Sequence, residues 1–344
     1  MKSLLLLSVV WLNLSLSSWA QTKPATTAPN QPAATEEQAV PGLRSFAITL
    51  AGVQREFVIY RPAELDTATK TPVVFAFHGT AGNGEDFLFD SGWQTIADRE
   101  GLTLVCGSAL RYHIFEKSKE HQGEVLEEVR SFTAKWNDFS LPTLLDPQFA
   151  QQKLSDDVKF VQLMVAFVKK NYAVDEARFY ATGFASGGEF TTRLSLQLAD
   201  TFAAFATTGS INAVSAEHIS SANQYAPFKP RPFAQIIGEM DSKLLHRAAL
   251  ESFPLDESAI APDSWLHSAT IKSTLAYLRL KDEFKFQRLP GAASYRYHTP
   301  TETGATHEFD LLIVEGMNHV HPNGGKQGFQ MAEVFWNFMK RYRR

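Results

Sequence analysis

The sequence predicts an α/β fold with a mostly parallel, doubly wound sheet and an antiparallel hairpin on its N-terminal side. Of the 344 residues, 44% are hydrophobic, so the chain can bury a full-sized core. Short apolar runs suit parallel strands that are buried on both faces. These runs stand at 72–77, 102–106, 178–182, 202–208, 233–237 and 309–314. Helical patterns separate them, and this alternation favours strands joined by helices.

The N-terminal hairpin and the helices follow from local patterns. Residues 45–50 and 53–60 alternate between apolar and polar side chains, and Ala51-Gly52 between them indicates a tight turn. The last helix carries one continuous apolar stripe, which is typical of a helix that packs on a sheet. We expect helices over 93–100, from the capping residues 155–157 to about residue 171, and over 331–342.

Composition divides the chain into three parts. Residues 1–20 have the features of a secretory signal peptide, because Lys2 precedes an apolar run and small residues precede a cleavage point after Ala20. Residues 21–42 are rich in Pro, Ala and Thr, which is typical of a disordered linker. We therefore expect a single folded domain over 43–344, a secreted or periplasmic location, and no membrane association after cleavage.

Charge and cysteine content exclude several classes of function. The chain has 33 basic and 37 acidic residues and no basic stripe, so nucleic acid is not an expected partner. The single cysteine, Cys106, lies in an apolar run and is expected to be a buried structural thiol. His319 and His321 share one face of an extended segment, but no third strong ligand motif accompanies them, so no metal and no cofactor are expected.

Two long connections, 111–152 and 244–289, interrupt the alternation of strands and helices. Long connections in α/β enzymes often form the rim or lid of an active site, but they are also common as surface insertions. The sequence leaves both interpretations open. Trp136 and Trp265 fall in these connections and are candidates for a substrate rim, whereas core packing suits Trp93 better.

The chemistry concentrates in residues 180–188, YATGFASGG, which leave a predicted strand and enter a helix. The nucleophile elbow of hydrolases has this context and the pattern Gly-x-Ser-x-Gly, because the turn is too tight for larger flanking residues. Gly183 and Gly187 occupy the two glycine positions, but Ala185 stands at the nucleophile position and Ser186 follows one residue late. A phosphate-binding turn is disfavoured, because no Gly-Lys-Ser/Thr follows.

Three more polar positions follow predicted strands. Thr80 lies in a His-Gly-Thr turn and could direct its backbone N–H into an oxyanion hole. Asp241 follows the strand at 233–237, and His319 follows the last strand. The chain order of elbow, Asp241 and His319 is the order of nucleophile, acid and histidine in α/β hydrolases. The sequence therefore predicts an α/β-hydrolase fold and the remains of its catalytic constellation.

These motifs resemble those of secreted polyhydroxybutyrate depolymerase-like and feruloyl-esterase-like α/β hydrolases. The resemblance runs from about residue 45 to Asp241 and resumes around His319. Its strongest stretches are Arg61-Pro62, Ala97-Asp98, 156–160, the approach to the elbow at 174–180 and the histidine loop GMNHVHP at 316–322. Where this family carries its serine, the present chain has Ala185.

The resemblance implies a carboxylic ester hydrolase. An elbow serine would attack the ester carbonyl, His319 oriented by Asp241 would act as base and then acid, and the N–H groups of Thr80 and Ser186 would hold the oxyanion. Ser186 begins the helix, where side chains are rotated by about 100° per residue, so it suits an oxyanion donor better than a nucleophile. It remains the alternative nucleophile if the turn is shifted by one position.

Two further readings of the whole chain stay open. One is a catalytically inactive binding module that holds an ester, an acyl sugar or a polymer, and the other is hydrolysis through an unusual nucleophile. The expected ligands are ester substrates or polymers, either polyhydroxyalkanoates or esters of plant polysaccharides.

Overall fold

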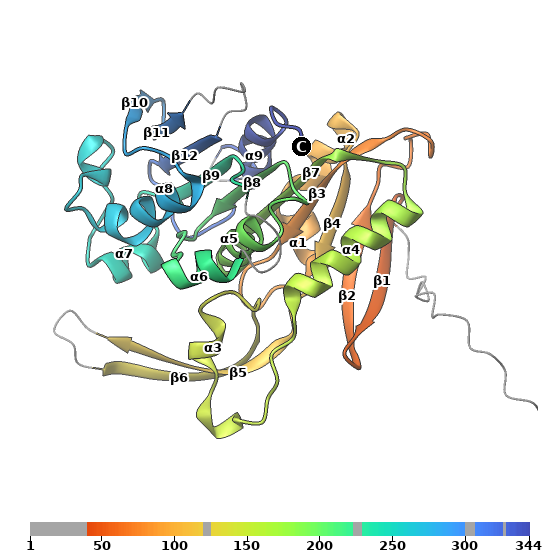
Figure 1. Cartoon of the computed structure of the whole chain (residues 1–344), viewed down its shortest axis with the longest axis horizontal. Coiled ribbons are helices and arrows are strands. Elements are labelled where there is room, and N and C mark those ends of the chain that lie inside the picture. The colour runs from red at the N-terminus through yellow and green to blue at the C-terminus, as the bar shows by residue number, and fades with distance from the viewer. Residues whose placement is uncertain (1–39, 120–124, 223–228, 300–306, 326–327) are drawn as a thin grey trace, which may run out of the picture. The chain divides into compact units, whose positions relative to one another are not determined.

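The computed structural model describes residues 40–119, 125–222, 229–299, 307–325 and 328–344 (Figure 1). All of them belong to one compact unit, Ala33–Arg344. The predicted signal peptide at 1–20 and nearly all of the predicted linker at 21–42 lie outside the described residues. Within the described part, no helix is both long enough and apolar enough to cross a membrane.

The main sheet has ten strands among the described residues. In spatial order they are β1 (Leu43–Leu50), β2 (Val53–Tyr60), β4 (Thr103–Gly107), β3 (Thr71–Phe77), β7 (Val174–Phe184), β8 (Ala204–Thr208), β9 (Phe233–Gly238), β12 (His307–Val314), β11 (Ala292–Thr299) and β10 (Phe284–Leu289). The six strands from β4 to β12 run parallel, and the strands on both sides of them pair antiparallel. The predicted α/β-hydrolase fold with its N-terminal hairpin is confirmed.

Helices cover both faces of this sheet (Figure 1). On one face, α1 (Gly84–Asp90), α2 (Trp93–Glu100) and α9 (Met331–Met339) bury their apolar side chains in one core cluster. On the other face, α4 (Asp157–Asn171), α5 (Ser186–Gln197), α7 (Ser242–Ala248) and α8 (Lys272–Leu278) contribute to a second cluster. The last helix ends three residues before the predicted boundary, and Tyr342 packs beyond it against the same core.

The antiparallel edge formed by β10 and β11 was not predicted. Exposed and partly buried residues alternate along β10, so it lacks the continuous apolar run that marks a central parallel strand. The remaining short helical segments lie in the connections: α3 (Leu141–Leu144), α6 (Ala216–Ala222), the 3₁₀ turns Pro147–Phe149 and Glu257–Ile260, and the π-helical turn His267–Ile271.

A separate two-stranded sheet occupies the first long connection, 111–152. It consists of β5 (Arg111–Lys119) and β6 (Val125–Ala134), and Figure 1 shows it standing away from the main sheet. Tyr112 and Ile114 on one of its faces pack with Leu141 in a small core of their own. This connection is therefore a structured hairpin arm.

Candidate active site

Four of the predicted site residues follow the carboxyl ends of parallel strands. Thr80 comes after β3, Ala185 directly after β7, Asp241 after β9 and His319 after β12. Parallel strands bring their carboxyl ends to the same edge of a sheet, which is where ligands bind in open α/β folds. The fold thus collects these residues along one edge.

Ala185 has the backbone geometry of a sharp elbow. Its φ is 49° and its ψ is −118°, a combination that costs a residue with a Cβ about 1–3 kcal/mol. Hydrogen bonds hold the turn on both sides: the Ala185 N–H donates to Thr208 O at 3.0 Å, and the Glu189 N–H donates to Ala185 O at 3.0 Å. Residue 185 therefore occupies the strained position between β7 and α5.

The two flanking glycines leave no space for a side chain. A Cβ on Gly183 would lie 2.1 Å from the carbonyl oxygen of Gly187. A Cβ on Gly187 would lie 2.2 Å from the carbonyl oxygen of Phe77, at the end of β3. Both contacts are far below van der Waals distance, so glycine at both positions lets the elbow pack closely against the neighbouring strand.

Ser186 is the first residue of α5, and its side chain is only 3% exposed. Its Oγ is buried and has no hydrogen-bond partner in the described part of the chain. Its hydroxyl thus makes no hydrogen bond to the imidazole of His319. This geometry differs from that of a serine activated by a general base, which needs a direct hydrogen bond to it.

Asp241 and His319 form a close pair. His319 Nδ1 lies 2.9 Å from Asp241 Oδ1 and 3.0 Å from Oδ2. Asp241 is fully buried and also accepts hydrogen bonds from the N–H groups of Lys243 and Leu244, at 3.1 Å each, as the N-cap of α7. These hydrogen bonds hold the carboxylate in place beside His319.

Backbone contacts bring the two loops of this pair together. The Met240 N–H donates to Met317 O at 3.0 Å, and the Glu239 N–H donates to Val314 O at 2.8 Å. A Cβ on Gly238 would lie 1.9 Å from Met317 O, so the close approach of the loops requires glycine there. The other ring nitrogen, His319 Nε2, has no partner within the described residues, and the side chain is 12% exposed.

The imidazole of His319 lies next to the elbow. Its ring is 5.1 Å from the ring of Phe184, the residue that precedes Ala185. A Cβ on Gly209, which follows β8, would lie 3.2 Å from His319 Cε1 and 2.7 Å from Phe184 Cε2. The glycine, with a φ of +64°, allows both rings to pack on this turn.

The turn after β3 also lies against the elbow. A Cβ on Gly79 would be 3.5 Å from the Cβ of Ala185, and the following Thr80 is exposed. The Ala81 N–H donates to Ala134 O at 2.8 Å, which ties this turn to the base of the hairpin arm. The turn is therefore held against the elbow from outside the main sheet.

His78 stabilises the same turn through hydrogen bonds. The sequence did not reveal this role. Burial lowers its pKa to about 4, and the neutral ring accepts a hydrogen bond from the Ala109 N–H at Nε2, at 3.0 Å. Its Nδ1 lies 2.6 Å from Gly79 O, and its own carbonyl accepts a hydrogen bond from Trp136 Nε1 at 3.0 Å. The His-Gly motif was the available signal, but Ala109 and Trp136, which also contact His78, are distant in sequence.

Comparisons with known proteins agree with this architecture. No protein-family model matches the chain. Over 158 residues the chain is 24% identical to the bifunctional acetylxylan esterase/xylanase XynS20E of Neocallimastix patriciarum, a match that covers 45% of this chain but 18% of that protein. An S-formylglutathione hydrolase from Agrobacterium tumefaciens has a TM-score of 0.52 at 12% identity, covering 90% of this chain and 99% of that one. The chain has an α/β-hydrolase fold.

A second solved structure supports the same assignment of the fold. An acetyl xylan esterase from Aspergillus awamori has a TM-score of 0.52 at 13% identity, covering 83% of this chain and 94% of that one. At these identities the likeness concerns the backbone, and the residues of the site must be judged from their own geometry.

His321, two residues after His319, lies in a different environment. The residue is partly exposed, but both ring nitrogens are buried without a partner in the described structure, and burial lowers its pKa to about 4. Its ring lies 5.3 Å from Phe87, 6.1 Å from Phe184 and 5.9 Å from Phe335. Among the described residues, no group of three His, Cys, Asp or Glu side chains could hold a metal ion.

The tryptophans divide between core and surface. Trp136 is fully buried and stacks on Phe190 at 4.9 Å, so its proposed place on a substrate rim is wrong. Trp93 is also fully buried, in agreement with core packing. Trp265 is partly exposed and lines a cavity of about 540 Å³ beyond α7. The sequence did not separate Trp136 from Trp265, because both stand beside polar residues in the long connections.

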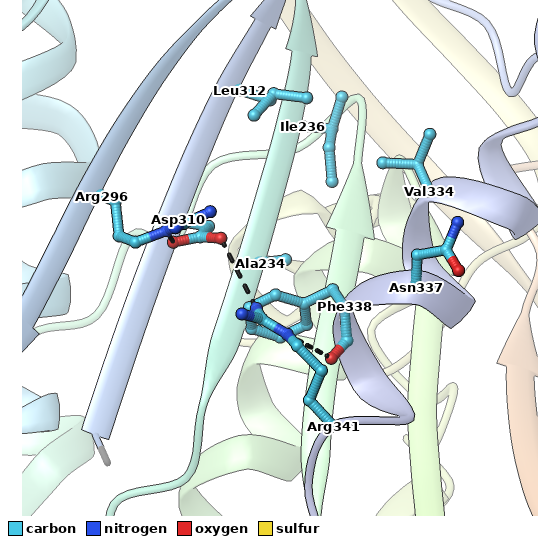
Figure 2. Close-up of a pocket in the computed structure, with 9 residues that line it drawn as sticks. All are labelled: Ala234, Ile236, Arg296, Asp310, Leu312, Val334, Asn337, Phe338 and Arg341. Atoms are coloured by element: carbon cyan, nitrogen blue, oxygen red, sulfur yellow. Dashed lines mark hydrogen bonds and ion pairs between the residues drawn. The ribbon is translucent and has the colours of Figure 1, made fainter. Parts of the chain in front are cut away.

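Another cavity, of about 270 Å³, lies between α9 and the strands β9, β11 and β12 (Figure 2). Neither Asp241 nor His319 lines it. Asp310 pairs there with Arg296 at 3.0 Å and with Arg341 at 3.7 Å. Burial, with the neighbouring Glu308 carboxylate, raises the pKa of Asp310. The charged groups of this cavity already pair with one another.

Proposed function

We propose that this chain binds carboxylic esters at the elbow and cannot form an acyl-serine intermediate there. The observation that carries the proposal is the elbow at Ala185, which keeps its strained geometry beside a paired Asp241 and His319 but presents only a methyl group. Ser186 does not replace the missing hydroxyl, because its Oγ is buried. The site has the surroundings of a serine ester hydrolase without the attacking atom.

The binding mode follows from the arrangement of the turns. The acyl carbon would lie over the Cβ of Ala185, and the carbonyl oxygen would accept hydrogen bonds from the N–H groups of Ser186 and Thr80. His319 would face the ester oxygen of the leaving group. The strained backbone conformation of Ala185 favours this binding mode. The direction of the Ser186 N–H depends on the backbone of the elbow and not on the side chain of residue 185.

The ligand class proposed is an ester of a plant polysaccharide. The curated relative is named an acetylxylan esterase/xylanase, and the matched solved structures include an acetyl xylan esterase. Polyhydroxyalkanoate, the other polymer class implied by the sequence resemblance, is the alternative ligand. The signal-like residues 1–20 support the secreted or periplasmic location that such a ligand requires.

Binding of a short ester tests the proposal directly. The purified chain is titrated calorimetrically with methyl ferulate and with an acetylated xylo-oligosaccharide, and saturable binding of at least one is expected. Ala185→Leu, which places a larger side chain where the acyl carbon must lie, should abolish that binding while circular dichroism remains unchanged. Absence of binding to the native chain, or equal binding by both proteins, contradicts the proposal.

Slow hydrolysis by solvent water is a second candidate function. His319 Nε2 has no partner within the described residues, so it can accept a proton from a water molecule that attacks the bound ester. The water oxygen would add to the carbonyl carbon of the ester while its proton passes to His319. The ester C–O bond would then break, and His319 would give that proton to the leaving alkoxide. A rate of ester hydrolysis that falls in His319→Ala supports this function, and an equal rate in both proteins contradicts it.

A further inference from the structure

The hairpin arm has one face that carries exposed aromatic and basic side chains. The strands pair antiparallel with Arg111 opposite Ala134, His113 opposite Phe132 and Phe115 opposite Arg130. Side chains directly opposite each other point to the same side of a sheet, so these six residues form one face, here called the outer face. The inner face carries Tyr112 and Ile114, which are buried at the base of the arm.

Aromatic rings dominate the outer face. The side chain of Phe132 is 50% exposed, and Phe149, which reaches this face from the neighbouring 3₁₀ turn, is 42% exposed. The ring of His113 lies between them, 4.5 Å from Phe132 and 3.6 Å from Phe149, with the latter planes within 5° of parallel. Large exposed rings that support one another in this way mark a surface for binding.

A cation without an acidic partner lies beside these rings. The Arg111 guanidinium is 5.1 Å from the ring centre of Phe132 and donates to Phe132 O at 2.8 Å. Arg111 is exposed and forms no ion pair with any residue that the structure describes. By contrast, Arg130 farther along the same face pairs with Asp146 at 3.2 Å. Arg111 therefore has its charge available for an anionic ligand.

The outer face begins at the candidate active site. Ala134 belongs to this face, and its carbonyl accepts the hydrogen bond from the Ala81 N–H, one residue after Thr80. Phe132 lies two positions farther out on the same strand, at about 3.3 Å per residue or about 7 Å from Ala134. A chain held by an ester at Ala185 could therefore continue over Phe132.

We propose that the outer face of the hairpin arm binds an acidic polysaccharide, the chain that carries the ester; this inference rests on the proposed function. Pyranose rings present flat C–H faces that pack on exposed aromatic rings. The carboxylate of a uronic acid residue pairs with the guanidinium of Arg111. An aliphatic polyester has no carboxylate along its chain, so it could use the rings but not this charge.

The opposite face of the same arm provides a matched control. Val129 pairs with Glu116, is 40% exposed, and lies on the face opposite Phe132. Val129→Ala removes exposed apolar surface from the arm without touching the outer face. The double variant Phe132→Ala with Phe149→Ala removes the two exposed rings of the outer face.

The experiment measures depletion of the purified full-length chain by insoluble glucuronoxylan, by the same xylan without its uronic acids, and by polyhydroxybutyrate particles. The double variant should bind glucuronoxylan at least about tenfold more weakly than the native chain, and Val129→Ala should bind like the native chain. Arg111→Gln should abolish the preference for the acidic over the neutral xylan. Unchanged circular dichroism and melting temperature confirm folding of each variant.

Each of these results overturns the inference: equal binding by the double variant and the native chain, an equal loss in Val129→Ala, a preference for the acidic xylan that survives in Arg111→Gln, or stronger binding to polyhydroxybutyrate than to glucuronoxylan. Calorimetric titration of the same samples with the two short esters, methyl ferulate and the acetylated xylo-oligosaccharide, separates this inference from the proposed function. If the native chain binds the short ester but not the polysaccharide, the docking face is wrong and the ester site stands. If it binds only the polysaccharide, the ester site is wrong and the docking face stands.

Discussion

The imidazole of His319 packs against the ring of Phe184 at a centroid distance of 5.1 Å, which places the histidine beside the residue that precedes Ala185. Its Nδ1 is bound to Asp241, and its Nε2 is left without a partner in the described structure. The imidazole is thus held by Asp241 beside a turn whose residue 185 carries a methyl group in place of a hydroxyl. This relationship makes the effect of restoring the hydroxyl predictable.

Ala185→Ser should create ester hydrolase activity. Loss of the nucleophile in a serine hydrolase costs on the order of 10⁶ in turnover, while the rest of the site retains about 10³ to 10⁴ over water. A gain of at least about 10³ on a short-chain aryl ester is expected, measured as initial rates of phenol release. The substitution adds one oxygen at a solvent-facing turn, so the fold should tolerate it.

The control for that gain is the double variant Ala185→Ser with His319→Ala. It should return to the activity of the native chain, because the new hydroxyl loses its base. A folded Ala185→Ser protein without any gain would show that the site has diverged beyond the loss of one atom.

Covalent labelling distinguishes residue 185 from residue 186. An organophosphonate ester that reports on activated serines should not label the native chain, because Ser186 Oγ is buried and unpaired. The Ala185→Ser protein should be labelled at residue 185, as shown by mass spectrometry of its peptides. Stoichiometric labelling of native Ser186 is the result that this prediction does not allow.

Gly183→Ala should destabilise the fold by about 3 kcal/mol, at the upper end of the usual cost of overpacking, because the new methyl group would overlap the backbone of Gly187 at 2.1 Å. Urea unfolding measures this free energy. Gly325→Ala is the matched control, since its Cβ would meet only Asn323 Oδ1 at an ordinary 3.5 Å. Similar losses in both variants would contradict the close packing of the elbow.

Replacement of His321 should change how stability depends on pH. Burial lowers the pKa of His321 to about 4, so between about pH 6.5 and pH 4 the unfolded chain binds a proton that the folded chain does not. Stability is therefore lost as the pH falls through this window. The native chain should lose stability in this window, and His321→Phe should not lose this contribution. The unfolding free energy of His321→Phe minus that of the native chain should therefore rise by about 2 kcal/mol from pH 8 to pH 5.

Urea unfolding of both proteins at both pH values measures the four unfolding free energies. The contributions of other titrating groups cancel in the comparison, because both proteins contain them. Phenylalanine is the suitable replacement, because the ring is surrounded by Phe87, Phe184 and Phe335. A difference between the proteins that is the same at both pH values would show that the ring does not stay neutral.

Local patterns in the sequence were sufficient for the central sheet and the elbow. Buried parallel strands such as β3 and β9 are continuous apolar runs, so their positions follow from composition alone. The tight turn at Ala185 requires glycine at positions 183 and 187, and that requirement is visible as a motif. The alanine between these two glycines is likewise visible in the sequence.

Contacts between distant segments were decided only by the tertiary structure. The pairing of His319 with Asp241 joins residues 78 positions apart. Their order along the chain predicted that they lie within hydrogen-bond reach, but the backbone contacts that join their two loops are visible only in the tertiary structure. Burial of Trp136 and of the Ser186 hydroxyl depends on what packs against each residue, which local periodicity does not encode. The hairpin arm is stabilised by pairing between its own two strands, so it could not be distinguished in the sequence from an irregular insertion.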